Sequence, residues 1–191
     1  MGAVGTADIT FASISAGYER KVGGGRMLMT IDVPGFGQVQ QGFDGTIAWA
    51  MDPQSGASKM DAGMTADVLS STSPTAGLWE SGSYTSAEVL DAADFEGAKT
   101  WPVKIVSKSG RARTVYYDQA TGLKIGEVIQ QPSGEQKNLY SAYKRFGAIS
   151  VATKVTQGTP NGDIVLNTTA VTFDAINAAI FVLPAAVKSL P

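Results

Sequence analysis

Few side chains in this sequence could do chemistry, and most of them are serine, lysine or aspartate. Cys and His are both absent, which excludes disulfides, thiol nucleophiles, the usual zinc sites and the commonest general base. A nucleophilic hydrolase would then need a Ser–Lys pair, and the near-neighbour candidates are Ser107, Lys108 and Ser109. These residues lie in an expected hairpin turn, where polar side chains serve solubility and turn geometry. We therefore assign no catalytic residue.

Aspartates and a glycine run are the other patterns that could carry chemistry. Paired carboxylates could come from Asp32, Asp44, Asp52 and Asp61, but no motif brings them together, and all four fit turns or strand edges. The glycines at 23–25 precede a strand instead of opening a helix, which is the wrong context for a phosphate loop. The acidic turns lack the ligand density of a calcium loop. We predict a protein that is not an enzyme and has no metal site and no cofactor.

Composition restricts the class of protein and its partners. With 191 residues, the chain is long enough for one domain over 1–191 with a proper hydrophobic core. Charged residues make up only 17% and Gly is abundant at 22, a balance typical of many strands joined by tight turns. The net charge of −2 gives no electrostatic footprint for nucleic acid. No run approaches the roughly 18 apolar residues that a transmembrane segment needs.

Alternation with a period of two residues dominates the chain and predicts strands. The run RMLMTIDV puts Met27, Met29 and Ile31 on one face, and Pro34-Gly35 ends it. Similar runs, each bounded by a Gly-bearing turn, recur from TWPVKIVSKSG to DIVLNTTAVTF. This spacing favours an antiparallel meander in which strands adjacent in sequence pair in the sheet.

The stretch QVQQGFDGTIAWAMD predicts a hairpin that turns at Asp44-Gly45. Its second strand would place Ile47, Trp49 and Met51 on one large apolar face. Something must cover that face, either the protein's own helices or a ligand.

Two segments break the alternation and predict short helices. Residues 61–82 fit a short helix capped at Thr65, whose buried side would include Met64, Val68, Leu69, Leu78 and Trp79. Near the C-terminus, FDAINAAIF fits a helical turn capped at Asp174. The expected fold class is α+β, a strongly curved antiparallel sheet, or unclosed half-barrel, with a few short helices over its concave face.

Methionines and aromatic residues gather in the first part of the chain and suggest an apolar cavity. Thioether side chains adapt to irregular ligands as readily as to irregular gaps in a core. The expected hydrophobic ligand-binding residues are Met27, Met29, Ile31, Ile47, Trp49, Met51, Met64, Leu69 and Trp79. The alternative is that these residues simply form the core between sheet and helices.

The segments VPGFGQVQQGFDGTIAWAMDPQSG, FEGAKTWPVKIVSKSGRARTVYYDQATGL, LYSAYKRFGAISVATKV and FVLP resemble the periplasmic outer-membrane lipoprotein-sorting proteins of the LolA/LolB type and their uncharacterised bacterial relatives. The resemblance covers residues 11–184. It implies an unclosed, curved barrel with helices at its mouth and an apolar cavity for acyl chains.

The sequence thus predicts a non-enzymatic periplasmic binding protein that holds a lipid, a lipoprotein acyl chain or another hydrophobic molecule. A structural or protein-interaction module with a self-filled core is the alternative. The expected partners are an apolar small molecule or acyl chain and, as a second candidate, a protein, and no nucleic acid is expected. The N-terminus, MGAVGTADITF, lacks a basic segment followed by an apolar core. For an exported protein, we therefore expect that a signal peptide has been removed.

Overall fold

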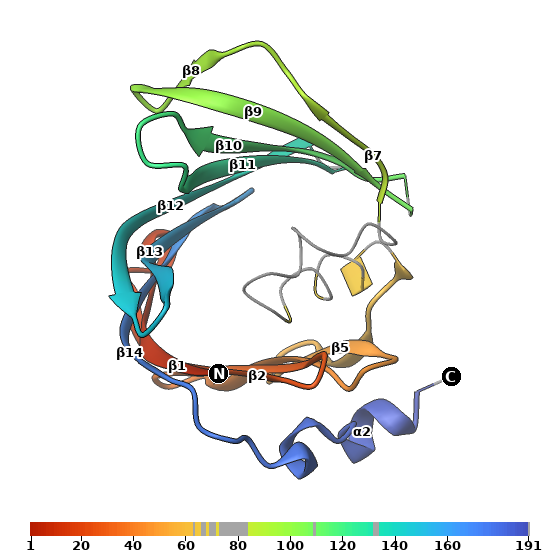
Figure 1. Ribbon diagram of the computed structural model, residues 1–191. Coiled ribbons are helices and arrows are strands. Elements are labelled where there is room, and N and C mark those ends of the chain that lie inside the picture. The colour runs from red at the N-terminus through yellow and green to blue at the C-terminus, as the bar shows by residue number, and fades with distance from the viewer. Residues whose placement is uncertain are drawn as a thin grey trace. The chain divides into compact units, whose positions relative to one another are not determined.

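The computed structural model describes residues 1–62, 64, 65, 68, 72, 84–108, 110–131 and 134–190. Contacts divide the chain into two compact units. Unit 1 holds Met1–Glu80 with Asn167–Pro191, and unit 2 holds Ser81–Leu166. Strands dominate both units (Figure 1). The expectation of a single domain over 1–191 stays a prediction.

Unit 1 is a meander of antiparallel strands. Each strand pairs with the next one in sequence, so that the order is β6-β5-β4-β3-β2-β1, with β14 beside β1. The run RMLMTIDV forms one strand, as predicted. The strands are β1 (Gly2–Ile9), β2 (Ile14–Gly23), β3 (Arg26–Val33), β4 (Gly37–Phe43), β5 (Ala48–Asp52), β6 (Gly56–Lys59) and the end of β14 (Gly162–Thr172).

Unit 2 repeats this pattern in the order β13-β12-β11-β10-β9-β7, with β8 also paired to β9. β12 has an irregular point at Ala142, whose φ of 52° is unusual for a residue with a side chain. The Thr153 hydroxyl donates a hydrogen bond to the Ala142 carbonyl there. The strands are β7 (Tyr84–Val89), β8 (Ala93–Phe95), β9 (Ala98–Ser107), β10 (Ala112–Asp118), β11 (Lys124–Gln131), β12 (Gly134–Phe146), β13 (Ile149–Thr159) and the start of β14.

The strand order confirms the main part of the predicted fold class. By hydrogen bonding, the sheet has 14 strands, and its order ends at β6 on one side and β7 on the other, so the sheet is unclosed. Every pairing whose register is described is antiparallel.

Helix is scarcer than expected in the part of the chain that the structure describes. The short helices with described bounds are η1 (Thr10–Ala12), η3 (Ala178–Phe181) and α2 (Ala185–Lys188). Residues 62, 64, 65 and 68 are also helical.

Both predicted helix caps were wrong by a few residues. The helix that contains Met64 begins after Asp61, because the Asp61 carboxylate accepts a hydrogen bond from the Met64 N–H at 2.7 Å. Thr65 therefore lies inside the helix. At the C-terminal end, the Asn177 side chain caps η3 by accepting from the Ala179 N–H, and Asp174 does not take this role.

The register of unit 1 divides its large apolar residues between two faces. Val22 pairs with Met27, Met27 with Phe43, and Phe43 with Ala48, so these residues share one face because directly paired residues project to the same side. We call this side the methionine face and define it by Val22, Met27, Met29, Ile31 and Phe43. Trp49 and Met51 pair with Gly42 and Gln40 and lie on the opposite side, which we call the tryptophan face.

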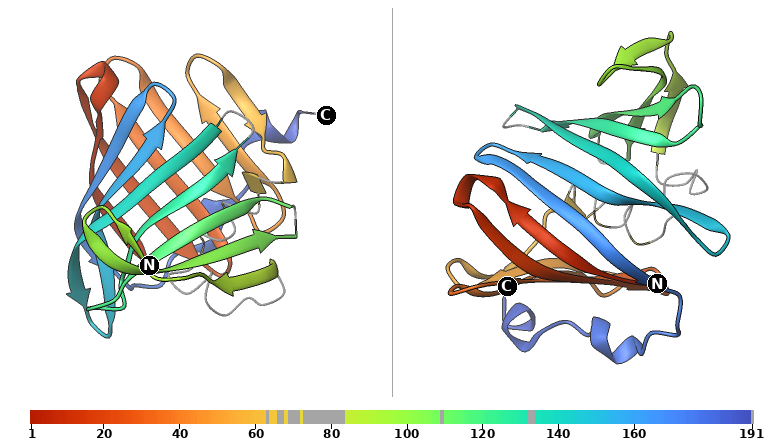
Figure 2. Two further views of the ribbon diagram at one scale, coloured as in Figure 1. Left: turned by 90° about the horizontal axis from the view of Figure 1, so that it is seen from above. Right: turned by 90° about the vertical axis from the view of Figure 1, so that its left-hand side faces the viewer.

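The C-terminal segment covers part of the tryptophan face, next to β3 and β6. The Phe181 ring is the nearest group to Gly23 on that side, and the Lys59 ammonium donates to the Leu190 carbonyl at 2.7 Å. Figure 2 shows this segment, in blue, lying against the red and orange strands of unit 1. Val187 and Phe181 are buried at 0% and 4% exposure. The chain itself therefore covers this part of the tryptophan face.

We predict that Gly42→Ala lowers the free energy of unfolding by about 1–3 kcal/mol, because overpacking strains a filled site. A Cβ at Gly42 would stand 2.3 Å from the Trp49 ring. Gly17→Ala is the matched control, since Gly17 is also in a strand and a Cβ there meets nothing within 4 Å. Urea denaturation measures both variants. Equal effects would contradict the packing of Trp49 on Gly42.

Candidate ligand-binding surfaces

The methionine face of unit 1 holds an apolar cluster of buried residues, with partly buried residues beside it. Val22, Met27 and Phe43 are buried at 3–5% exposure and pack with Ala48 and the helical residue Val68. Met29 lies two residues further along β3, is only partly buried and packs against the cluster. Ile31 continues the same face and is also partly buried. Along this face of β3, Met27 and Val33 are therefore buried, and the less covered part is the middle, at Met29 and Ile31.

The structure does not bring the predicted ligand-binding residues together on one face. Met27, Met29 and Ile31 lie on the methionine face, whereas Trp49 and Met51 lie on the tryptophan face. Ile47 lies in the turn before β5, where its N–H donates to the Asp44 carboxylate at 2.8 Å. The predicted hairpin itself is confirmed.

The remaining predicted residues belong to the 61–82 segment. Met64 is helical and 44% exposed. Leu69 and Trp79 lie outside the described residues. Val68, which was expected on the buried side of this segment, is 6% exposed and packs on the methionine face.

Trp49 lies in a buried part of the tryptophan face. Its side chain is 2% exposed, and its indole Nε1–H has no hydrogen-bond partner in the described part of the chain. An unpaired buried donor carries a desolvation cost of about 1–3 kcal/mol. The ring packs over Gly42, and burial of its large apolar surface offsets this cost.

Unit 2 presents a different surface, on which charged side chains are buried among apolar ones. We call this side the charged face and define it by Arg113, Lys124, Glu127, Asn138 and Tyr140. Glu127 pairs with Val115 on β10 and with Asn138 on β12. Glu127 and Asn138 are each 5% exposed, as closely buried as Val115 at 3%.

A β-bulge places Lys124 on the charged face. In a regular strand, residues three apart point to opposite sides, so Lys124 and Glu127 could not meet. The register of β10 with β11 shifts between Tyr116 and Tyr117, and Tyr117 pairs with Lys124. The extra residue re-aims the side chain. The Lys124 ammonium then lies 2.8 Å from the Glu127 carboxylate.

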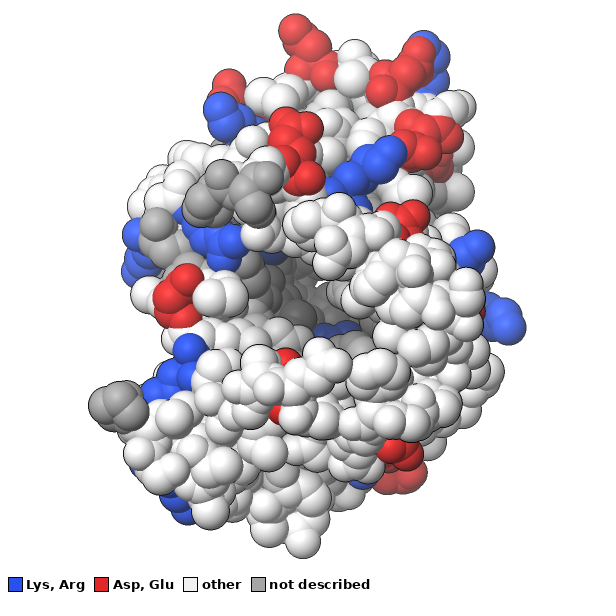
Figure 3. All heavy atoms as spheres, turned by 180° about the vertical axis from the view of Figure 1, so that it is seen from behind, with Lys and Arg blue, Asp and Glu red and all other residues white. Residues whose placement is uncertain are grey.

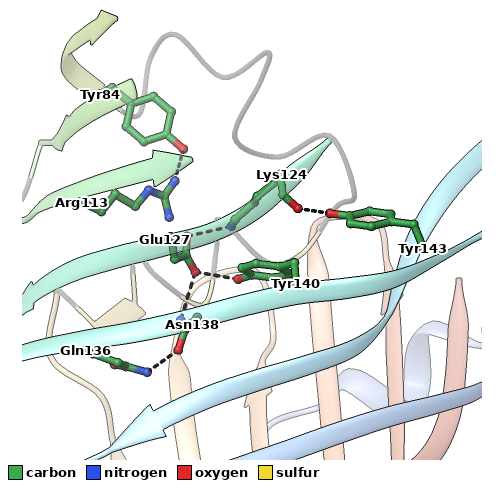
Figure 4. Close-up of polar contacts among 8 residues, drawn as sticks. All are labelled: Tyr84, Arg113, Lys124, Glu127, Gln136, Asn138, Tyr140 and Tyr143. Carbon is green, nitrogen blue, oxygen red and sulfur yellow. Dashed lines mark hydrogen bonds and ion pairs between the residues drawn. The ribbon is translucent and has the colours of Figure 1, made fainter. Parts of the chain in front are cut away.

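Three donors satisfy the Glu127 carboxylate, as Figure 4 shows. The Lys124 ammonium bonds to Oε2, while the Asn138 amide and the Tyr140 hydroxyl bond to Oε1 at 3.1 and 2.7 Å. The Gln136 amide in turn donates to Asn138 at 3.2 Å. Burial acts to raise the pKa of Glu127, but the Lys124 charge and these hydrogen bonds overcome it and lower the pKa to about 2.

Aromatic rings surround the ion pair. The Lys124 ammonium lies 4.0 Å from the centre of the Tyr140 ring, within the range of a cation–π contact. The Arg113 guanidinium donates to the Tyr84 hydroxyl at 2.8 Å. Burial raises the pKa of the Tyr117 hydroxyl, and it raises that of Tyr143 to about 12. These hydroxyls stay protonated at neutral pH and can donate hydrogen bonds.

Charges of both signs are present on the face of the molecule that Figure 3 shows. Lys and Arg are interspersed with Asp and Glu there. Within the described ranges, no three His, Cys, Asp or Glu side chains are grouped so that they could hold a metal ion. No described helix has the length and apolar character needed to cross a membrane.

The sequence analysis missed the charged face. A signal was present, because Glu127 alternates with Ile125 and Ile129 in KIGEVI. That spacing puts a carboxylate on the same side as two isoleucines, and a buried carboxylate needs a partner. The partner could not be found by alternation, since only the bulge places Lys124 on that side.

Comparison with known proteins identifies the fold. The sequence matches no family model, and it matches no curated protein sequence. Solved structures with the same fold do exist. The chain resembles a LolA superfamily protein from Nitrosomonas europaea with a TM-score of 0.65 and 13% identity, over 95% of this chain and 88% of that one.

Two further structures agree with this likeness. A DUF1329 family protein from Desulfovibrio piger has a TM-score of 0.67 at 13% identity, over 97% of this chain and 90% of that one. A putative outer membrane lipoprotein-sorting protein domain from Vibrio parahaemolyticus has a TM-score of 0.56 at 14% identity, over 88% and 83%. The chain therefore has a LolA-like fold, which confirms the resemblance seen in the sequence.

We predict that Glu127 makes folding sensitive to acid. Because its pKa is about 2 in the folded chain and near 4.5 when exposed, its stabilising effect is present above about pH 4.5 and is lost as the pH falls towards 2. The loss should be on the order of 3 kcal/mol. Chemical denaturation at a series of pH values measures it.

The Glu127→Gln variant should be less stable at pH 7, because Lys124 loses its counter-charge, but should lose less stability than the parent between pH 4.5 and 2. Asp94→Asn is the control, since Asp94 pairs with Lys99 at an exposed site. If Glu127→Gln and the parent had parallel pH profiles, the ion pair would not be the acid-sensitive element.

Proposed function

We propose that this protein is a non-enzymatic binding protein that holds a hydrophobic ligand, such as a lipid or an acyl chain, on the methionine face of unit 1. One observation carries this proposal. The methionine face continues past its buried cluster into Met29 and Ile31, which are only partly buried, whereas on the other face the chain's own C-terminal segment covers the region around Gly23 and Lys59.

The chemistry of the methionine face suits a flexible apolar ligand. Burial of apolar surface supplies about 25 cal/mol per Å², and methionine side chains adjust to irregular shapes. Met29 and Met60 already pack on the cluster from its edge. A ligand lying along β3 would extend this packing towards Ile31. To reach Met27, it would have to displace Val68.

The structural relatives support an acyl ligand and an exported location. One is described as a LolA superfamily protein and another as a putative outer membrane lipoprotein-sorting protein domain. Their likeness to this chain is one of fold, at 13–14% identity, so the ligand and the periplasmic location are proposals for this protein. Neither the fold nor the residue inventory favours an enzyme.

We predict that Met29→Gln weakens the binding of a fluorescent fatty-acyl probe about tenfold. Gln has nearly the size of Met but loses roughly 1–2 kcal/mol of apolar burial. Met51→Gln is the matched control, because Met51 is also partly buried in a strand of unit 1 but lies on the tryptophan face. Fluorescence titration of the purified variants gives both affinities.

Native mass spectrometry of the freshly purified protein should detect a bound lipid. If no lipid copurifies and the probe does not bind, the result would favour the alternative of a structural or interaction module with a self-filled core. If Met51→Gln weakened binding as much as Met29→Gln, the ligand would not be confined to the methionine face.

A further inference from the structure

A row of hydrogen-bond donors crosses three strands of unit 2 beside the charged face. Trp101 on β9 pairs directly with Tyr117 on β10, and Tyr117 pairs directly with Lys124 on β11. Directly paired residues project to the same side of a sheet, so the three side chains are neighbours on one face. We call this set the donor row.

The donor row can donate more hydrogen bonds than it uses. The Trp101 side chain, which is 49% exposed, has an indole N–H that can only donate. The Tyr117 hydroxyl makes no hydrogen bond to any described residue. The Lys124 ammonium has three N–H groups, and its hydrogen bonds among the described residues are limited to the one with Glu127.

The nearest acceptor cannot satisfy these donors. The Glu127 carboxylate already accepts from Lys124, Asn138 and Tyr140, and its two oxygens point towards β12 and Lys124 (Figure 4). The Lys124 side chain is 28% exposed, so part of it is open to solvent. A ligand that fits this surface must bring its own acceptors.

We propose that the donor row of unit 2 binds an oxyanion, a carboxylate or phosphate group. Such a group has acceptor oxygens and no need for donors, which complements indole N–H, phenol O–H and ammonium. Lys124, which pairs directly with Tyr117, supplies a positive charge within the donor row. The bulge at Tyr116–Tyr117 is what brings Lys124 into the row.

This site goes beyond the proposed function, because it uses unit 2 residues alone. The oxyanion can come from the headgroup of an apolar ligand or from a free anion. Both sources have the same chemistry at the donor row. Three probes distinguish them: sodium octanoate, 1-octanol of the same chain length, and sodium phosphate.

Isothermal titration calorimetry should find that octanoate binds at least tenfold more tightly than octanol, because a hydrogen bond to a charged group discriminates by about that factor or more. Tyr117→Phe should weaken octanoate binding about tenfold and leave octanol unchanged. Tyr116→Phe is the control, since Tyr116 lies on the opposite face, stacked on Phe95.

Lys124→Met should abolish the preference for octanoate over octanol. This variant leaves Glu127 without its counter-charge and can fail to fold, so thermal unfolding is measured first and Tyr117→Phe, which removes one hydroxyl, remains the decisive variant. If phosphate binds and Tyr117→Phe weakens its binding as it weakens that of octanoate, a free anion is sufficient to occupy the donor row. Octanoate binding without phosphate binding identifies a headgroup on an apolar chain.

Equal affinities for octanoate and octanol overturn the proposal, as does an equal effect of Tyr116→Phe and Tyr117→Phe. No binding of either anion also overturns it. These failures are separate from a failure of the proposed function, which is measured by the response of an acyl probe to Met29→Gln.

Discussion

The alternation of side chains along a strand is the constraint on which the rest of unit 1 depends. Each strand residue must lie on one of two faces, and each apolar face must be removed from water. On the tryptophan face, η3 and α2 cover apolar residues next to β3 and β6, and their Phe181 and Val187 side chains are buried. On the methionine face, Val68 packs over the buried cluster, but Met29 and Ile31 stay partly exposed. The candidate ligand surface is thus a part of the methionine face that the described chain covers incompletely.

Much of this sheet could be predicted from the sequence, but the relation between its faces could not. Alternation within β3 and β5 is visible in the residues, and so is the Asp44-Gly45 turn. Whether Met27 and Trp49 share a face depends on the length of the turn between β3 and β4. A two-residue turn at Pro34-Gly35 would pair Met27 with Gly42 and place it on the side of Trp49. The turn has one more residue, Val33 pairs with Gly37, and a shift of one residue reverses every side chain.

The bulge in unit 2 also changes the face on which a side chain lies, and here the side chain is a charged one. One extra residue in β11 turns Lys124 towards Glu127 and Tyr117. Without it, Glu127 would be a buried carboxylate without its ion pair, a state that costs several kcal/mol. Propensity and composition do not indicate where a strand will hold an extra residue, because the bulge depends on how both neighbouring strands pair. The sequence indicates individual polar residues of the charged face, such as Glu127. It does not indicate that these side chains contact one another.

The position of β14 has a consequence for the order of events in folding. Its last residues belong to unit 1 together with β1, where the Thr169 hydroxyl donates to the Val4 carbonyl across 165 residues of sequence. This edge of β1 therefore stays unpaired until β14, which lies far later in the sequence, has been made. Contacts between such distant residues are slow to form. During synthesis, this edge of β1 has no partner until residues 162–172 have emerged, and an unpaired strand edge can pair with another chain.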